Sequence, residues 1–348
     1  MSGDGAKHSR LPPAPGTTVA VPPGAIPLPR TPFPHVSRGD VPLLMPYVYV
    51  VALGLAIYSL NSNLLVGPGA LDARFSLIVP LALVAFGQTL VMFTRGIDLS
   101  VGGLISMVSA LLAAHLNEGG WLLVLELLAV VVVAVLIGSL NGALVAYTGL
   151  QPFIVTLATW SIWGGVAFAI LPVEGGQPSA GLISAVLGDL AGVPKSVWAV
   201  ALLLLLWYWL RPTRFITDLI AIGSDEERAR LLGVHLVRRR LQAYALSAVL
   251  AALASIWVTA QTEAGAPNGG DQFILSSVAA VVLGGTSIFG GKGSAASSIV
   301  GATAFLMIPD LVFALNLTSF WSIFFQGFIL ILAVTFNSII QQRAGSRA

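Results

Sequence analysis

The sequence contains no cysteine, and only 9% of its 348 residues carry a charge. The absence of cysteine excludes disulfide bonds, thiolate nucleophiles and cysteine-ligated metals. An ordinary soluble domain has roughly 25% charged residues, and a chain with so few could not cover its surface in water. The composition therefore makes a lipid bilayer the expected solvent.

Two further classes of protein are disfavoured by what is scarce. The four histidines, His8, His35, His115 and His235, show neither metal-ligand spacing nor a nucleophile–base pair, which argues against a membrane enzyme. The sequence has no basic stripe with interleaved aromatic residues, so nucleic acid is not an expected partner. We therefore expect no catalytic residue and no metal or other cofactor on this chain.

Apolar residues are abundant: they make up 56% of the chain, and its mean hydropathy is +0.90. They form successive runs of about the 17–25 residues that a helix needs to cross a bilayer. These runs lack the ten-residue alternation of a membrane β-barrel. The pattern predicts an all-α integral membrane protein of about ten transmembrane helices, at residues 43–60, 74–94, 98–116, 121–146, 152–171, 196–210, 240–260, 272–288, 294–315 and 319–340.

The N-terminal segment, residues 1–41, differs from the rest because it is rich in proline. Proline removes backbone donors and disfavours helix, so we expect a disordered, solvated tail. The tail does not resemble a signal peptide, because the first apolar run begins only near Pro42 and further spans follow it. A transmembrane domain is expected over residues 42–341.

The positions of the positive charges predict the orientation. If the N-terminus is cytoplasmic, all but two of the 17 lysines and arginines fall on or toward the cytoplasmic side, and Arg74 and Lys195 fall outside. An even number of spans also returns the C-terminus, with Arg343 and Arg347, to the cytoplasm. We therefore expect both termini to be cytoplasmic, together with a long loop at about 211–240.

A short polar break interrupts the apolar pattern at Thr94–Gly103. Asp98 and Ser100 are good helix N-caps, and the glycines of this segment, Gly96 among them, permit an irregular backbone. Irregular backbone at membrane depth is tolerated only where protein or water surrounds it, which indicates a discontinuous or re-entrant element beside a translocation path. The alternative is a tight cytoplasmic turn in which Asp98 is an N-cap.

A second break, glycine-rich, occupies residues 284–294. It departs from the phosphate-loop pattern G-x-x-x-x-G-K-[ST], because Thr286 stands where glycine is needed and Gly293 where serine or threonine is needed. It lies between predicted membrane spans, six spans after the first break and in the same setting, which indicates an internal pseudo-repeat. The residues that define it are Gly284, Gly285, Gly290 and Gly291.

The long cytoplasmic loop is predicted to contain a short polar helix. Ser224 or Asp225 can cap its N-terminus, acidic residues occupy its first turn, and Gly233 can end it. Glu226 and Arg230 stand at i, i+4 and can pair. The helix either docks in a groove on a partner protein or lies as an ordinary amphipathic helix at the membrane surface.

Polar residues within the predicted spans and at the first break are candidates for a translocation path, because their exposure to lipid would be costly. Such residues also pack helices together, and Gly138 to Gly142 form a small-xxx-small pattern, so packing is the alternative role. The path candidates are the polar residues Gln88, Asp98, Ser100, Asn141 and Thr156, together with Gly96 of the first break and the aromatic Trp160.

Three segments together resemble the permease subunits of the monosaccharide ABC importers, a group that includes ribose, xylose, arabinose and galactoside permeases. The first is G-I-D-L-S-V-G at Gly96–Gly102, and the second is A-A-V-V-L-G-G-T-S-x-x-G-G-K-G at Ala279–Gly293. The resemblance covers roughly residues 75–335 and leaves the proline-rich tail outside it. The third segment is the cytoplasmic coupling motif, carried here by Ala221, Gly223, Ala229, Gly233 and Val234.

The resemblance implies a subunit that imports a small sugar, a pentose, hexose or related polyol, across the bacterial inner membrane. Two permeases, identical or paired, would form the path, a periplasmic sugar-binding protein would deliver the sugar, and ABC ATPase subunits would bind ATP and Mg²⁺. This chain would then be a transport subunit and not itself an enzyme. The coupling helix to the ATPase would comprise Gly223, Ser224, Asp225, Glu226, Arg228, Ala229, Arg230, Leu231, Leu232 and Gly233.

One departure and two alternatives accompany this interpretation. In the relatives an acidic pair, in a pattern like E-L-D, is expected where this chain has Ile274, Leu275 and Ser276. One alternative is the branched-chain amino acid type of ABC permease, which shares the general plan; the other is a secondary transporter that works without ATP. The G-I-D-L-S and L-G-G-T-S segments favour the sugar group.

Overall fold

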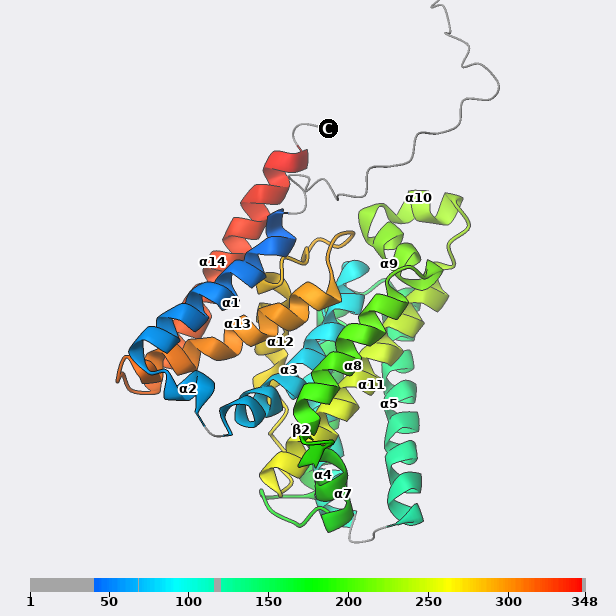
Figure 1. Ribbon diagram of the computed structural model, residues 1–348. Helices are drawn as coiled ribbons and strands as arrows, with labels where there is room; N and C mark the ends of the chain where they lie inside the picture. The colour runs from blue at the N-terminus through cyan, green and yellow to red at the C-terminus, as the bar shows by residue number, and fades with distance from the viewer. Residues whose placement is uncertain (1–40, 68, 116–119, 346–348) are drawn as a thin grey trace, which may run out of the picture. The chain divides into compact units, whose positions relative to one another are not determined.

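The computed structural model describes residues 41–67, 69–115 and 120–345, which fold almost entirely into α-helices (Figure 1). A two-stranded hairpin is formed by β1 (Asp189–Leu190) and β2 (Val193–Pro194). The helices are α1 (Val41–Leu60), α2 (Asn63–Val66), α3 (Ala70–Phe93), α4 (Ser100–His115), α5 (Trp121–Thr148), α6 (Pro152–Ile170), α7 (Ala180–Val186), α8 (Lys195–Leu210), α9 (Arg214–Ser224), α10 (Glu226–Leu231), α11 (Leu236–Thr262), α12 (Asp271–Leu283), α13 (Ala295–Ala314) and α14 (Phe320–Gly345).

Each apolar run singled out in the sequence lies on a helix, which confirms the all-α membrane fold. Among the described residues, α3, α5, α6, α11 and α13 are long and apolar enough to cross a bilayer. The apolar parts of α1, α4, α12 and α14 are shorter. The number of ten spans and the cytoplasmic placement of the termini stay predictions, and the proline-rich tail up to residue 40 lies outside the described residues.

The helix boundaries differ from the prediction at two places. The predicted span 272–288 ends at Leu283, because Gly284 and Gly285 begin the glycine-rich turn and Gly285 has a φ of +76°. The loop predicted at 211–240 contains an additional helix, α9, which buries Ile216, Leu219 and Ile222 on one face. Helix α9 is bent by 77° from α8 at a break that contains Pro212.

Helix α11 is central to the packing and lies against α3, α4 and α5. Its closest approach to α5 is made possible by the small residues of the G-x-x-x-G pattern. A Cβ added at Gly138 would lie 2.4 Å from the carbonyl oxygen of Tyr244, and one added at Gly142 would lie 2.7 Å from the Cα of Leu241. The G-x-x-x-G pattern therefore packs α5 against α11. This agrees with helix packing, which the sequence offered as the alternative role of these small residues.

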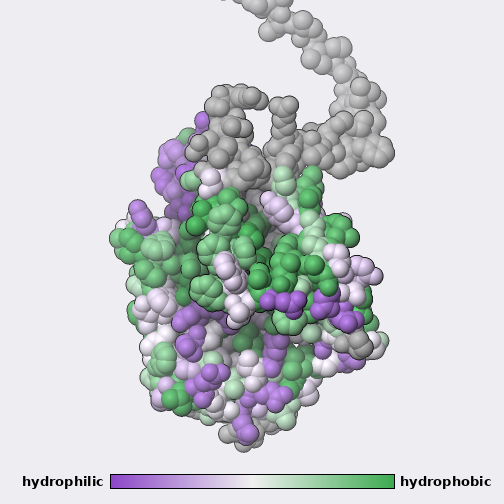
Figure 2. Space-filling view, turned by 90° about the vertical axis from the view of Figure 1, so that its left-hand side faces the viewer, coloured by the Kyte–Doolittle hydropathy of each residue, from purple (hydrophilic) through white to green (hydrophobic). Residues whose placement is uncertain are grey.

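Large apolar side chains cover much of the outside. Figure 2 shows a broad hydrophobic area on the face where α1 and α14 lie, and Val51, Leu55, Ile323 and Ile331 are each more than half exposed there. In water such a surface would be a strong aggregation hazard. In a bilayer the same side chains face lipid or another apolar protein surface at little cost.

The close approach of α5 and α11 predicts opposite effects for two glycine-to-alanine changes. Gly138→Ala should lower the melting midpoint of the detergent-solubilised protein, because overpacking of about 1–3 kcal/mol outweighs the helix-propensity gain of about 1 kcal/mol. Gly164→Ala is the matched control, since its Cβ would meet no atom within 4 Å. Its melting midpoint should stay or rise, and equal stabilisation by both changes would contradict the observed packing.

Candidate functional site

Helix α10 forms at the predicted position and presents two leucines to the outside. Its N-cap is Asp225, whose Oδ1 accepts a hydrogen bond of 3.0 Å from the backbone N–H of Arg228. The helix ends before Gly233, which has a φ of +82°. Leu231 and Leu232 are 79% and 82% exposed. A short helix with a protruding apolar pair has the form of a docking element.

Ion pairs fasten the α9–α10 segment to the first turns of α11. Arg239 pairs with Asp218 of α9 at 2.6 Å, and Arg240 pairs with Glu226 of α10 at 2.6 Å. The side chains of both arginines are mostly shielded, at 21% and 17% exposure. Two pairs to one helix end orient the segment more firmly than the exposed pairs within α10 can.

The glycine-rich break and the coupling motif meet in the fold at the end of α3, directly before the first break. The backbone N–H of Gly291, in the glycine-rich break, donates to the carbonyl oxygen of Phe93 at the end of α3. Gly223, at the end of α9, lies against both, because a Cβ added to it would stand 1.8 Å from Phe93 O and 2.5 Å from Gly291 N. Only glycine fits such a position. We call this contact of Phe93, Gly223 and Gly291 the motif junction.

Arg95 bridges the motif junction with its guanidinium group. Its Nε donates to the carbonyl oxygen of Gly223 at 2.7 Å, and its Nη2 donates to that of Ser224 at 2.9 Å. These are the last carbonyls of α9, where a cation satisfies free acceptors and the negative end of the helix dipole. The sequence argument used Arg95 only as a positive-inside charge. Its position in the first break, next to Gly96, was the feature of the sequence that could have indicated this second, structural role.

Most of the path candidates gather around the first break in a buried polar network. The Asp98 carboxylate accepts from Ser100 N at 3.1 Å and Ser100 Oγ at 2.5 Å through one oxygen, and from Ser247 Oγ at 3.0 Å through the other. The Asn141 amide donates to Ser100 Oγ at 2.8 Å. In the orientation that satisfies both groups, the Gln88 amide pairs with the backbone N–H and C=O of Asp98.

This network supports the irregular backbone of the break. Thr156 Oγ1 adds a hydrogen bond of 3.0 Å to the carbonyl oxygen of Ile97, and Gly96 packs beneath the Tyr244 hydroxyl. The network residues are 0–2% exposed, and their polar groups bond to the protein. The exception is Asn141 Oδ1, which is buried without a hydrogen-bond partner among the described residues. The backbone of Trp160 packs against Gly103 at the end of the break, and its side chain bonds elsewhere, since Nε1 donates to Asp271 Oδ1 at 3.0 Å. That any of these residues lines a path stays a prediction.

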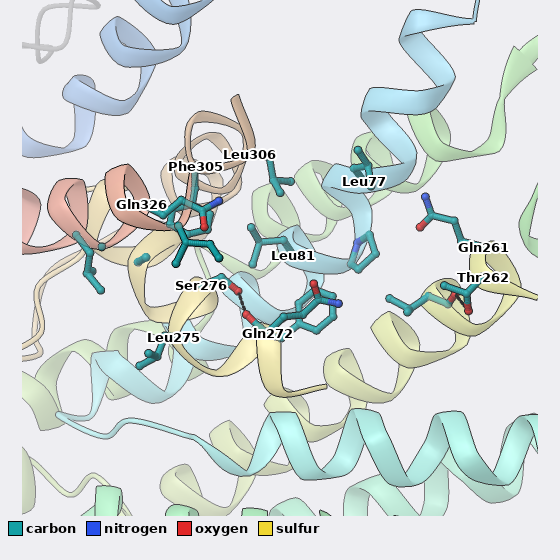
Figure 3. A pocket seen from close by; sticks show the side chains of 17 residues that line it. Leu77, Leu81, Gln261, Thr262, Gln272, Leu275, Ser276, Phe305, Leu306 and Gln326 are labelled. Atoms are coloured by element: carbon teal, nitrogen blue, oxygen red, sulfur yellow. Dashed lines mark hydrogen bonds between the residues drawn. The ribbon is translucent and has the colours of Figure 1, made fainter. Parts of the chain in front are cut away.

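The structure also reveals a groove that the sequence argument did not single out. It has a volume of about 640 Å³ and is formed by α3, α11, α12, α13 and α14. Gln326 and Gln261 lie at its two ends and Gln272 lies between them (Figure 3). The signal available in the sequence was the single glutamine in the apolar first half of α14, set in the run F-W-S-I-F-F-Q-G-F-I-L-I-L. The lining is mainly apolar, with Phe273 and Phe305 among its residues, and Thr262 and Ser276 are its polar residues besides the three glutamines.

The bridging role of Arg95 predicts a local loss of order when its charge is removed. Arg95→Met should speed amide hydrogen exchange in residues 223–233 about tenfold, since two hydrogen bonds from a charged donor contribute at least about 1.4 kcal/mol. Hydrogen–deuterium exchange with mass spectrometry would measure it. Lys292→Met, an exposed cation of the neighbouring glycine-rich break, is the control. Equal exchange in Arg95→Met and the unmodified protein would contradict the bridge.

Comparison with known proteins identifies several relatives. The chain is 30% identical to the ribose import permease protein RbsC of Bacillus subtilis, over 85% of this chain and 92% of that one. It is 33% identical to RbsC of Escherichia coli, over 73% and 80% of the two chains. It is also 33% identical to the autoinducer 2 import system permease protein LsrC of Salmonella choleraesuis, over 79% and 82%. No solved structure matches the chain significantly.

A family model also matches most of the chain. Residues 71–334 fit the model described as branched-chain amino acid transport system / permease component. The matched region begins at the start of α3 and ends within α14, so it includes the motif junction, the polar network and the groove. The chain therefore belongs to this family of transport-system permease components.

Proposed function

We propose that this chain is the membrane-spanning permease subunit of an ATP-driven importer that carries a small sugar across the bacterial inner membrane. The single observation that carries the proposal is the motif junction beside α10. It joins an exposed docking helix to a break in the transmembrane core through Gly223 and Arg95. The relatives named as ribose import permeases support a sugar as the cargo.

ATP and Mg²⁺ are proposed to bind to a partner ATPase. A phosphate loop needs free backbone N–H groups that point at the nucleotide. In the glycine-rich break these groups are engaged within the protein: Gly291 N donates to Phe93 O, Ser287 N to Lys292 O, and Gly290 N to Ser287 O. The break therefore has the character of a packing element, and the chain has the role of a transport subunit.

Coupling is proposed to run from α10 to the first break. An ATPase that binds Leu231 and Leu232 would move α10. The ion pairs that Arg239 and Arg240 form with α9 and α10 would then move the first turns of α11 as well. Arg95 would transmit the displacement of α9 to the backbone between α3 and α4. The hydrogen bonds of the buried Asp98 network hold that backbone in one conformation, so that it would move as a unit.

Further partners complete the proposed importer. A second permease, either an identical copy or a paralogue, would pair with this chain through part of its exposed apolar surface, and lipid would cover the remainder. A periplasmic binding protein would deliver the sugar. The description of the matching family model makes a branched-chain amino acid the second candidate for the cargo.

Purification with the native partners tests the assembly and the cargo. The tagged chain is expected to bring an ATPase with a true phosphate loop, and the complex in liposomes with its binding protein should take up radiolabelled ribose when ATP is added. Leucine uptake without ribose uptake would favour the second candidate. Counterflow of substrate by the chain alone, without ATP, would reject an ATP-driven importer.

The docking role of α10 predicts loss of the ATPase when its leucines are truncated. Leu231→Ala with Leu232→Ala should reduce co-purified ATPase more than tenfold, because each side chain buried in an interface contributes roughly 1.5 kcal/mol or more. Leu150→Ala, an exposed leucine outside α10, is the control and should keep the ATPase. An undiminished ATPase yield from the double variant would exclude α10 as the docking element.

A further inference from the structure

Gln326 presents an amide that has no partner within the described part of the chain. It lies in the apolar first half of α14, and no hydrogen bond joins its side chain to any of the described residues. An amide that faces hydrocarbon costs free energy unless something satisfies it. Its position in the groove therefore calls for water or a polar ligand at this place (Figure 3).

Two more amides reach the same groove from other helices. Gln261 lies near the end of α11 and likewise makes no side-chain hydrogen bond within the described part of the chain. Gln272 lies in the first turn of α12, where its Nε2 makes only one long contact, 3.3 Å, with the carbonyl oxygen of Gly269. Three helices thus contribute amides with free donors and acceptors to one cavity.

The groove has the chemistry of a site for an uncharged polyhydroxylated molecule. An amide offers both donors and acceptors, as a sugar hydroxyl does, and Phe273 and Phe305 add apolar surface for the C–H faces of a ring. None of the 17 side chains that line the groove, all of them described, is ionisable. A free amino acid carries two charges that such a lining would leave unpaired. The volume of about 640 Å³ is within the range of ligand pockets, roughly 300–1,000 Å³.

Helix α12 connects the groove to the motif junction. Gln272 and Ser276 lie in its first two turns, and the helix ends at Leu283, directly before the glycine-rich break. Its 13 residues span about 20 Å. Movement of Gly291 at the motif junction would therefore shift the amide of Gln272 in the groove. The segment Ile274–Ser276, where the chain departs from the pattern it resembles, lies on this helix and contributes Leu275 and Ser276 to the lining.

We infer that this groove holds the sugar during translocation, with Gln261, Gln272 and Gln326 as the residues that hydrogen-bond its hydroxyls. The inference rests on the proposed function and extends it to a specific site. Gln272 is the contact that changes position with the state of the ATPase, because it lies on α12. Gln326 and Gln261 supply contacts from α14 and α11.

Cysteine labelling tests whether the groove holds water and sugar. The chain has no cysteine, so Gln326→Cys or Gln272→Cys introduces the only thiol of this subunit. In the assembled transporter, a charged, membrane-impermeant thiol reagent should modify both, and ribose added during ATP turnover should slow the reaction several-fold. Phe328→Cys, which is exposed but is not among the groove residues, is the control.

The control should react slowly and show no effect of ribose. Labelling of Gln326→Cys no faster than that of Phe328→Cys would mean that lipid fills the groove, and would overturn the inference. Labelling that is fast but unchanged by ribose would overturn it as well.

Transport by leucine variants provides a second, independent test. Gln326→Leu keeps the size of the side chain and removes the amide, so ribose uptake should fall at least tenfold at equal amounts of assembled complex. Phe328→Leu should leave uptake unchanged. Wild-type rates for Gln326→Leu would reject the groove assignment alone. An unmodified transporter that takes up no sugar would reject the proposed function, and the sugar assignment with it.

Discussion

The close approach of three backbone segments at Gly223 is the constraint on which the rest of the site depends. Phe93 ends α3, Gly291 belongs to the glycine-rich break, and Gly223 is the next-to-last residue of α9, yet the three meet without an intervening side chain. A methyl group at Gly223 would separate them and remove the acceptors that Arg95 needs. The path from the exposed helix α10 to the first break exists only because this position has no Cβ.

The sequence predicted the fold and the motifs because both are encoded locally. Hydrophobic length located the helices, the capping residue Asp225 located α10, and the G-x-x-x-G pattern indicated a packing face on α5, whose partner, α11, only the structure shows. The same reasoning failed for α12, whose apolar run continues past Leu283 although glycine ends the helix there. It also passed over α9, because a strongly amphipathic helix inside a charged loop has no span-length hydrophobic signal.

The buried network around Asp98 and the glutamines of the groove differ in a way that the sequence alone could not show. Gln88 and Gln326 are both glutamines in apolar helices, and hydropathy treats them alike. In the fold, Gln88 is fully buried and pairs with the backbone of Asp98, whereas Gln326 faces a groove and its amide has no partner among the residues that the structure describes. The difference depends on contacts between residues far apart in the chain, so it appears only when the helices are assembled. Polar side chains with internal partners hold the structure, and those without partners can bind a ligand.

The 77° bend between α8 and α9 has a mechanical consequence. A helix set nearly perpendicular to the preceding span acts as a lever arm, with its fulcrum at the break that contains Pro212. A force applied at α10 produces a torque about that corner, and Gly223 and Ser224, at the far end of the arm, describe an arc. The distance that Arg95 moves with these residues then depends on the length of α9, which is about 16 Å for its eleven residues. A stiff corner is therefore as important for transmission as the hydrogen bonds at the tip.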